Sequence, residues 1–322
     1  MTFERILEDR HNACRYPTQP CCYSTTRISY IESLEQVTLQ GIDRQYRVHN
    51  IEAANEGAAP LVLHLHGYRH RHEAEAGRET LDYIAWKKLE ETADVNGFIL
   101  AQPAAYWGQW SLFSGLANIK LENGLEIDDM QFISEVVDKL INAGLADKNR
   151  VYLSGISDGA IMSYHLLCEP DSPFAAAVTI VGTMSEKQIS NCATRTATPI
   201  MVIAGTNDRI LPYDGGLFPE GRDVSIPEIM EHWRIKHGCK EQKFEFLKDR
   251  DLEDNSRVQS ITWTKCDRED TVKLLRIEGA GHAVPSFAPV SDAWSQRGGG
   301  HNRDIESAEE VWAFVKKFRF TR

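Results

Sequence analysis

Short runs of almost entirely apolar residues recur along this 322-residue chain, and they restrict the fold more than any other feature. A strand with one face in water alternates apolar and polar residues, whereas a strand covered on both faces is apolar throughout. The runs of the second kind are residues 61–66, 98–101, 150–154, 175–181 and 199–204. Segments with helical spacing accompany them, at residues 80–96, 128–143 and 305–318. The sequence therefore predicts an α/β fold with a mainly parallel central sheet covered by helices on both faces.

The N-terminal residues differ in patterning from the rest of the chain. Residues 1–36 show no clear periodicity and contain Pro17 and Pro20, so we interpret them as an N-terminal arm. From residue 37 onwards, strand and helix patterns follow one another without an internal repeat or a low-complexity linker. A stretch of this length can bury a substantial core as one unit. We therefore predict a single domain over residues 37–322 that carries the candidate catalytic residues.

The charge and hydropathy of the chain restrict the classes of partner that it could bind. A net charge of −11 with no basic stripe argues against nucleic acid, because phosphate binding needs clustered lysine and arginine. No apolar run approaches the roughly 20 residues of a membrane span, so we expect no membrane partner. The first residues lack a basic segment followed by an apolar one. We therefore expect a cytoplasmic protein.

The sequence Gly-Ile-Ser-Asp-Gly at residues 155–159 lies between the strand predicted at 150–154 and a predicted helix at 160–168. In that context the G-x-S-x-G pattern is typical of a nucleophile elbow, a sharp turn that presents the serine at the carboxyl end of a strand. A Cβ atom at position 155 or 159 would collide with neighbouring backbone in such a turn. Ser157 is therefore a candidate nucleophile, and an ordinary serine in a βα turn is the alternative.

A serine hydroxyl needs a general base and an orienting acid. In hydrolases built on a doubly wound sheet, the three residues follow in the order Ser, Asp or Glu, His. Asp208 comes shortly after the run ending at residue 204, and His282 follows the strand predicted at 272–277 between glycine-rich neighbours. Both are candidates, although Asp208 could instead stabilise a turn and His282 could be a loop histidine. Weaker candidates for the two roles are Asn207, Asp214 and His301.

The same interpretation assigns an oxyanion hole and a pocket wall. Two backbone N–H donors are needed about 3 Å from the developing alkoxide. We expect them to be the amides of Asp158, directly after the serine, and Tyr68, after the run at 61–66. Trp107 and Trp110 lie in an aromatic-rich loop and are interpreted as substrate-binding residues, with plain core packing as the alternative.

Four histidines, His64, His66, His70 and His72, raise the alternative of a metal site. No carboxylate or cysteine completes a ligand set beside them, and no C-x₂-C pair at zinc spacing occurs. We therefore expect no metal and no other cofactor.

Seven short motifs together give the chain a family resemblance. They are His66-Gly67, Asp128-Asp129, Arg150-Val-Tyr, the pentapeptide at 155–159, Gly205-Thr-Asn-Asp208, Pro212-Tyr-Asp-Gly-Gly216 and Gly281-His282-Ala-Val-Pro285. Through this set of motifs, the chain from about residue 37 onward resembles the α/β-hydrolase family of polyhydroxybutyrate depolymerases, feruloyl esterases and acetylxylan esterases. The resemblance implies the α/β-hydrolase fold and a triad of Ser157, Asp208 and His282. Cys239 and Cys266 resemble a disulfide-forming pair of secreted members.

At two positions the chain departs from that family. Asp158 stands where the family usually has asparagine, and Val284 stands where it usually has a tryptophan that touches substrate. We therefore include Val284 among the substrate-binding candidates. The missing leader segment also favours free thiols at Cys239 and Cys266, against the pairing that the resemblance implies.

The expected function is hydrolysis of carboxylic esters through an acyl-serine intermediate. The resemblance implies a small or oligomeric ester of feruloyl, acetyl-sugar or hydroxyalkanoate type. An acyltransferase using the same residues is one alternative, and a catalytically silent binding protein with this fold is another.

Overall fold

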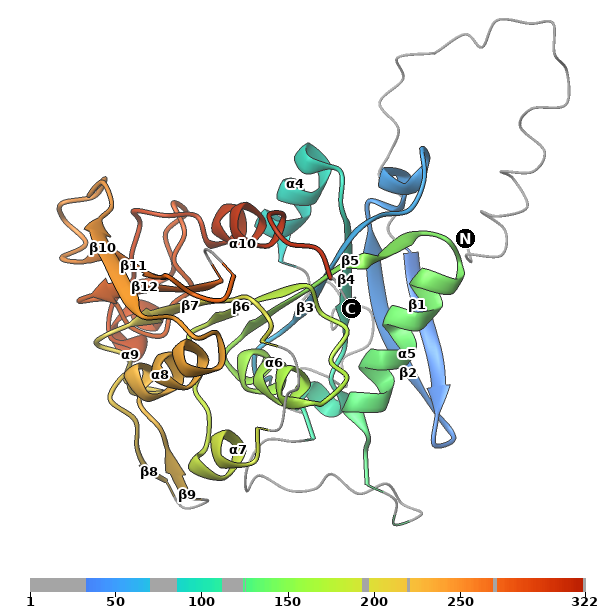
Figure 1. Ribbon diagram of the computed structural model, residues 1–322, viewed down its shortest axis with the longest axis horizontal. Coiled ribbons are helices and arrows are strands. Elements are labelled where there is room, and N and C mark those ends of the chain that lie inside the picture. The colour runs from blue at the N-terminus through green and yellow to red at the C-terminus, as the bar shows by residue number, and fades with distance from the viewer. Residues whose placement is uncertain are drawn as a thin grey trace, which may run out of the picture.

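The computed structural model describes residues 33–69, 86–111, 124, 126–192, 197–218, 221–268 and 271–320. Within these residues ten strands form one large sheet that crosses the middle of the molecule (Figure 1). Its strand order is β1-β2-β4-β3-β5-β6-β7-β12-β11-β10. Two short strands, β8 (Gly216–Phe218) and β9 (Gly221–Asp223), form a separate small sheet. The site described below lies at the carboxyl ends of the inner strands of the large sheet.

The six inner strands of the large sheet run parallel to one another. They are β4 (Ile99–Pro103), β3 (Ala59–Leu65), β5 (Ala146–Ile156), β6 (Ala176–Ile180), β7 (Ile200–Gly205) and β12 (Val272–Glu278). Antiparallel strands flank them, β1 (Ser33–Leu39) and β2 (Ile42–His49) at one edge, β11 (Arg257–Thr264) and β10 (Glu241–Phe246) at the other. The predicted mainly parallel sheet is confirmed.

Helices cover both faces of this sheet. In Figure 1, α4 and α10 lie above the strands, and α6 and α8 lie below them. The buried side chains of α5 belong to the same core as those of α6 and α8. The bounds are α4 Lys87–Asn96, α5 Asp129–Asn142, α6 Asp158–Cys168, α7 Glu186–Ser190, α8 Ile226–Lys236, α9 Asp292–Gly298 and α10 Ser307–Val315, with single turns at Ile51–Ala54 and Tyr106–Gly108. Two cores result, one on each side of the sheet.

The apolar runs are explained by these two cores. Along β3, Leu61 and Leu63 belong to the core under α5, α6 and α8, whereas Val62 between them belongs to the core under α4 and α10. Successive side chains of a strand point to opposite faces. With both faces covered, most positions of an inner strand are therefore apolar. The α/β-hydrolase fold that the motifs implied is the observed one.

Several boundaries differ from the sequence prediction. Residues 33–36, assigned to the N-terminal arm, are the first residues of β1, and the arm itself lies outside the described residues. The helix expected at 80–96 is described only from Lys87 onward, as α4. Strand β10 was not predicted, because all its side chains are exposed and no apolar pattern marks it.

Two disulfides tie the helical layer to neighbouring segments. Cys239 pairs with Cys266, so the disulfide that the family resemblance implied is present, and the free thiols that the missing leader segment favoured are not observed. Cys168 at the end of α6 pairs with Cys192 after α7, which the sequence did not suggest. The other three cysteines, Cys14, Cys21 and Cys22, lie outside the described residues.

None of the helices in the described part of the chain is both long enough and apolar enough to cross a membrane.

Candidate active site

Ser157 occupies a strained turn between β5, which ends at Ile156, and α6, which begins at Asp158. Its backbone has φ 54° and ψ −118°, a conformation that L-residues adopt rarely. A Cβ added at Gly155 would lie 2.2 Å from the carbonyl oxygen of Gly159. One added at Gly159 would lie 2.1 Å from the carbonyl oxygen of Leu65. Only glycine fits at either position, so the G-x-S-x-G spacing is a steric requirement of this turn.

The structure brings the three residues of the predicted triad together. Ser157 Oγ lies 2.9 Å from His282 Nε2, and His282 Nδ1 lies 2.8 Å from Asp208 Oδ2. The other carboxylate oxygen, Asp208 Oδ1, accepts hydrogen bonds from the amides of Ile210 and Leu211 at 2.8 and 2.9 Å. Because Nδ1 donates to the carboxylate, Nε2 is left to accept the serine proton. This geometry suits nucleophilic attack by Ser157.

The weaker candidates for acid and base have other partners. The Asn207 side chain donates to the carbonyl oxygen of Gly299 at 2.5 Å, and Asp214 is exposed on the segment before β8. His301 Nε2 lies 3.1 Å from the carbonyl oxygen of Val284, and burial lowers the pKa of its ring. His301 therefore holds the backbone at the cavity wall instead of acting on Ser157.

The turn formed by Gly298, Gly299 and Gly300 at the end of α9 joins the loop that carries Asp208 to the loop that carries His282. The sequence did not reveal this connection. The carbonyl oxygen of Gly298 accepts from the amides of Arg209 and His282, at 3.2 and 2.9 Å. Gly299 has φ 101°, and a Cβ there would lie 1.9 Å from the carbonyl oxygen of Asn207. The signal was present in the three successive glycines at 298–300, but nothing local indicated what they touch.

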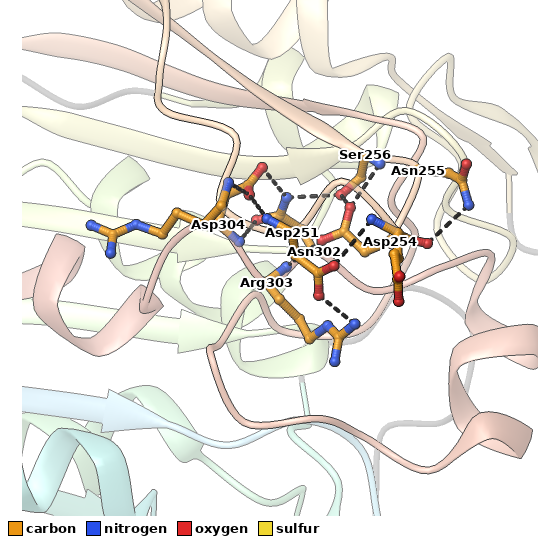
Figure 2. Close-up of polar contacts among 9 residues, drawn as sticks. Asp251, Asp254, Asn255, Ser256, Asn302, Arg303 and Asp304 are labelled. Atoms are coloured by element: carbon orange, nitrogen blue, oxygen red, sulfur yellow. Dashed lines mark hydrogen bonds and ion pairs between the residues drawn. The ribbon is translucent and has the colours of Figure 1, made fainter.

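A network of polar contacts joins residues 250–256 to residues 302–304 (Figure 2). Asp304 Oδ1 accepts from the Arg250 amide at 2.7 Å, and Asp254 Oδ2 accepts from the Arg303 amide at 2.8 Å. The Asn302 side chain donates to Ser256 Oγ at 2.8 Å. These bonds hold the loop between β10 and β11 against the segment between α9 and α10. We call this set the 254–304 network.

The network is connected to the site through the chain that follows His282. The carbonyl oxygen of Asn302 accepts from the Ser286 amide at 3.2 Å, and Ser286 Oγ donates to Glu306 at 2.7 Å.

Within the described residues, no group of three or more His, Cys, Asp or Glu side chains is arranged to hold a metal ion. His70 and His72, considered earlier as ligands, lie outside those residues.

The loop after β3 is held against the serine by His66. Its Nε2 accepts from the Ala105 amide at 3.0 Å, and its Nδ1 donates to the carbonyl oxygen of Gly67 at 2.6 Å. This pattern requires a neutral ring, and burial lowers the His66 pKa to about 4. A Cβ at Gly67 would lie 3.3 Å from Ser157 Cβ. The loop is therefore positioned beside the nucleophile, as the oxyanion hypothesis requires.

The two predicted oxyanion donors lie on this loop and at the start of α6. The amides in the first turn of a helix have no acceptor within the helix, so the Asp158 amide is available. Tyr68 follows Gly67 and lines the cavity over Ser157. Donation by these amides to an oxyanion stays a prediction.

A cavity of about 520 Å³ opens over Ser157 and His282. Most of its wall is aromatic or apolar, from Tyr68, Trp86, Ile156, Val284 and Trp294. Trp294 of α9 meets the His282 ring edge-on at 6.3 Å. The His64 ring packs on Trp86 at 4.9 Å, and burial lowers the His64 pKa to about 3. The cavity suits an ester with an apolar or aromatic group.

Trp107 and Trp110 are not among the described residues that line this cavity. Trp110 is 2% exposed, and its indole donates to the carbonyl oxygen of His66 at 2.9 Å. Trp107 stacks on Tyr106 at 4.8 Å, in a small cluster with Ile127. Trp110 therefore supports the loop after β3 from behind. The tryptophans that line the cavity are Trp86 and Trp294, whereas Val284 lies in the wall as expected.

Comparisons with known proteins show which family this chain is similar to. The family described as phospholipase/carboxylesterase matches residues 47–218. The bifunctional acetylxylan esterase/xylanase XynS20E of Neocallimastix patriciarum is 25% identical over 73% of this chain, which spans 30% of that protein. A Nocardia uniformis subsp. tsuyamanensis protein described as an esterase, NocK, is 24% identical over 84% of this chain and 81% of its own length.

Solved structures agree on the fold. An acetyl xylan esterase from Aspergillus awamori superposes with a TM-score of 0.55 at 16% identity, over 88% of this chain and 99% of that one. An identity this low supports the shared α/β-hydrolase architecture alone. With the family match and the sequence relatives, it confirms the resemblance drawn from the motifs.

Proposed function

Because this chain belongs to the phospholipase/carboxylesterase family and is a carboxylic ester hydrolase, we propose that it cleaves its substrate through an acyl intermediate on Ser157. The observation that carries the proposal is the continuous hydrogen-bonded series from Ser157 Oγ through His282 to Asp208. A serine in this setting can lose its proton to the imidazole at the moment of attack.

The proposed reaction has two halves. Ser157 Oγ attacks the ester carbonyl carbon while His282 Nε2 takes the hydroxyl proton, and Asp208 stabilises the imidazolium through Nδ1. The C–O bond to the alcohol then breaks, and His282 returns the proton to the leaving oxygen. Water, deprotonated by the same imidazole, then attacks the acyl carbon. The bond from that carbon to Ser157 Oγ breaks, His282 returns the proton to Oγ, and the acid is released.

Negative charge on the carbonyl oxygen builds up in both tetrahedral states. We assign its stabilisation to the amides of Asp158 and Tyr68. The tight contact between Gly67 and Ser157 supports this assignment, because it leaves the two segments adjacent at the site of attack. Backbone amides held by a helix start and by the His66 contacts need little reorganisation during the reaction.

Among the ester types that the sequence suggested, we favour an aromatic acyl group of the feruloyl type. The cavity offers two indoles, Trp86 and Trp294, and Val284 lies in its wall at the position where the resembled family usually has a tryptophan. About 520 Å³ is a volume suited to a group much larger than acetyl. Stacking between aromatic rings adds about 0.5–1.5 kcal/mol beyond area burial.

A substrate panel tests both parts of the proposal. Purified enzyme and Ser157→Ala would be compared on a feruloyl ester, an acetylated xylo-oligosaccharide and a hydroxybutyrate ester. We expect the highest kcat/KM on the feruloyl ester and a loss of several powers of ten in Ser157→Ala. Preference for the acetyl or hydroxybutyrate ester would overturn the acyl-group proposal. Near-normal hydrolysis by Ser157→Ala would overturn the nucleophile assignment.

The two disulfides lead us to propose an oxidising compartment, in place of the cytoplasm that the sequence suggested. Structural disulfides are rare in reducing cytosol and common in oxidising compartments. Cys168–Cys192 and Cys239–Cys266 both connect buried or half-buried segments. Peptide mapping after alkylation inside the producing cells tests this proposal. Four alkylated thiols at these positions would contradict it.

A further inference from the structure

Strand β10 (Glu241–Phe246) ends the large sheet on one side and presents an open edge. Figure 1 shows it at the outer left of the sheet, beyond β11. All its side chains are exposed, and within the described residues no strand pairs with its outer side. An edge of this kind carries a row of backbone N–H and C=O groups with which another strand can pair. β10 is therefore a candidate surface for association.

The pairing with β11 determines which backbone groups of β10 point outward. The Leu247 amide donates to the carbonyl oxygen of Val258 at 2.9 Å, in register with the paired residues of β10. In an antiparallel pair, residues bonded in this way alternate with residues whose backbone groups point away. The backbone groups of Lys243 and Glu245 therefore face β11. The residues whose N–H and C=O groups face the open edge are Gln242, Phe244 and Phe246.

The apolar side chains of β10 lie on one face of the sheet. Phe244 and Phe246 are 67% and 46% exposed. Phe244 is opposite Ile261 of β11, which packs against the core under α8. The Arg257 guanidinium lies 4.5 Å from the centre of the Phe246 ring. The apolar layer of this face thus continues to the open edge and ends there in solvent.

The other face of β10 carries alternating charges, in the order Glu241, Lys243 and Glu245. Glu241 forms an ion pair with Lys265 of the same chain. In the part of the chain that the structure describes, neither Lys243 nor Glu245 forms an ion pair. A single charge on an edge strand commonly opposes pairing with other strands. Here two opposite charges lie two residues apart, so a reversed copy of the same strand would match both.

A two-fold axis through Phe244 gives this match. Phe244 then lies opposite Phe244 of the second copy, and Gln242 lies opposite Phe246 of the second copy, so that the outward backbone groups of both strands meet. The same register places Lys243 opposite Glu245 of the second copy, and the symmetry repeats this ion pair. Opposite charges and aromatic rings that face each other across two strands both stabilise the pairing.

The other registers that bring outward backbone groups together fit less well. An axis through Lys243 places this lysine against its own copy, and an axis through Glu245 does the same with two carboxylates. Like charges directly opposite each other destabilise strand pairing. An axis through Gln242 or Phe246, near either end of β10, leaves much of the strand without a partner. Charge and strand length together therefore select the register centred on Phe244.

We propose that two copies of this chain associate through β10, which pairs antiparallel with itself around Phe244 and makes the two sheets continuous. None of the residues that line the cavity over Ser157 belongs to β10, so the pairing uses no residue of the site. The proposal is independent of the reaction assigned to that site. One short strand from each copy buries less than the roughly 1,200 Å² of a standard interface. We therefore expect reversible association with a Kd of about 1–100 µM.

The test exchanges the two charges and measures self-association of the full chain by sedimentation equilibrium, at about 1–200 µM protein. Lys243→Glu and Glu245→Lys each place like charges opposite one another and should weaken association by about 10- to 100-fold. The double variant Lys243→Glu/Glu245→Lys restores opposite charges and should associate like the wild type. Lys187→Glu makes the same charge change at an exposed position of α7 and is the matched control, which should also associate normally.

A mixture of the two single variants provides a second check of the register. Each variant carries the charges that the other one needs, so an equal mixture should associate about as tightly as the wild type. Restored association in the mixture and in the double variant supports the proposal. A wild type that stays monomeric over the whole range would overturn it. So would an equal loss in Lys187→Glu, or a double variant that associates as weakly as the single ones.

Hydrogen exchange of the wild type decides the matter if the β10 variants do not fold, as judged by circular dichroism. The Phe244 and Phe246 amides point to the open edge in one copy and become hydrogen-bonded in the pair. We expect these amides to exchange more slowly at about 200 µM protein than at about 1 µM. Equal exchange rates at the two concentrations would overturn the proposal.

Discussion

Ser157 lies between β5 and α6 in the middle of the sheet, whereas Asp208 and His282 lie on loops beyond β7 and β12. On the serine side, position is set by backbone packed against backbone, with no room for a Cβ at Gly155 or Gly159. On the histidine side, position is set by hydrogen bonds from the turn at 298–300 and the 254–304 network (Figure 2). The serine side is built where α6 packs on β3 and β5 within the sheet, and the histidine side where the loops after β7 and β12 meet the turn at 298–300.

This difference predicts how the serine side and the histidine side respond to substitution. Packing inside the sheet is shared with the core, so a change at the elbow should affect folding and activity together. Loop contacts lie outside the core, so a change there should move His282 while the fold persists. A displacement of about 1 Å can cost about 10²-fold in rate. The two halves should therefore respond differently to equally small substitutions.

The largest effect is expected from Gly159→Ala. The new methyl group would lie 2.1 Å from the carbonyl oxygen of Leu65, inside the contact between α6 and β3. Backbone on both sides prevents relief, so we expect loss of soluble, cooperatively folded protein, as judged by circular dichroism and thermal unfolding. A folded variant with near-normal Tm would contradict the packing account of the serine side.

Asp208→Asn should preserve the fold and cost roughly 10⁴-fold in kcat, because an amide favours the wrong histidine tautomer. Asp214→Asn, an exposed aspartate in the same loop region, is the control and should be nearly silent. Steady-state kinetics on the best ester would measure both variants. A mild Asp208→Asn with a severe Asp214→Asn would mean that the acid has been misassigned.

Gly299→Ala sharpens the comparison on the histidine side. Its Cβ would lie 1.9 Å from the carbonyl oxygen of Asn207, so the turn must move away from the acid loop. We expect a folded protein with kcat reduced about 10²-fold. Gly57→Ala is the control, because Gly57 also has a positive φ, 133°, but open space around it. Equal losses of activity in the two variants would show that backbone strain, and not the turn's contact, is responsible.

The smallest effect is expected from Asp254→Ala. Removing this carboxylate leaves the amides of Arg303 and Ser256 without their acceptors, which should cost about 1–3 kcal/mol of unfolding free energy. Glu253→Ala, with an exposed side chain, is the control. Urea unfolding of both variants measures the difference. Equal stability would mean that the 254–304 network contributes little to holding the histidine segment.

The same contrast explains what the sequence could predict. Ser157, Asp208 and His282 could be named as candidates because each lies in a short glycine-rich motif after a predicted strand, and local patterns carry that information. Trp86 and Trp294 were missed because only the folded chain brings α9 and the start of α4 to the cavity. Trp107 and Trp110 could not be assigned to pocket or core from the sequence, because an aromatic-rich loop looks the same whether its rings face a pocket or the core.

Other gaps have equally physical causes. The pairing of Cys168 with Cys192 depends on how α7 returns to the end of α6, which no spacing rule specifies. The resemblance supplied the pairing of Cys239 with Cys266, and residues alone did not. The glycines at 298–300 were visible, but their contacts to residues about 90 positions earlier in the chain were not, because such contacts leave no local pattern.

Labelling with a fluorophosphonate tests the central assignment most directly, since this reagent reacts only with a serine activated by its base. Wild type, Ser157→Ala and His282→Ala would be treated at one pH and mapped by peptide mass spectrometry. We predict stoichiometric modification of Ser157 in the wild type and none in either variant. Modification of another serine, or undiminished labelling of Ser157 in His282→Ala, would contradict the site described here.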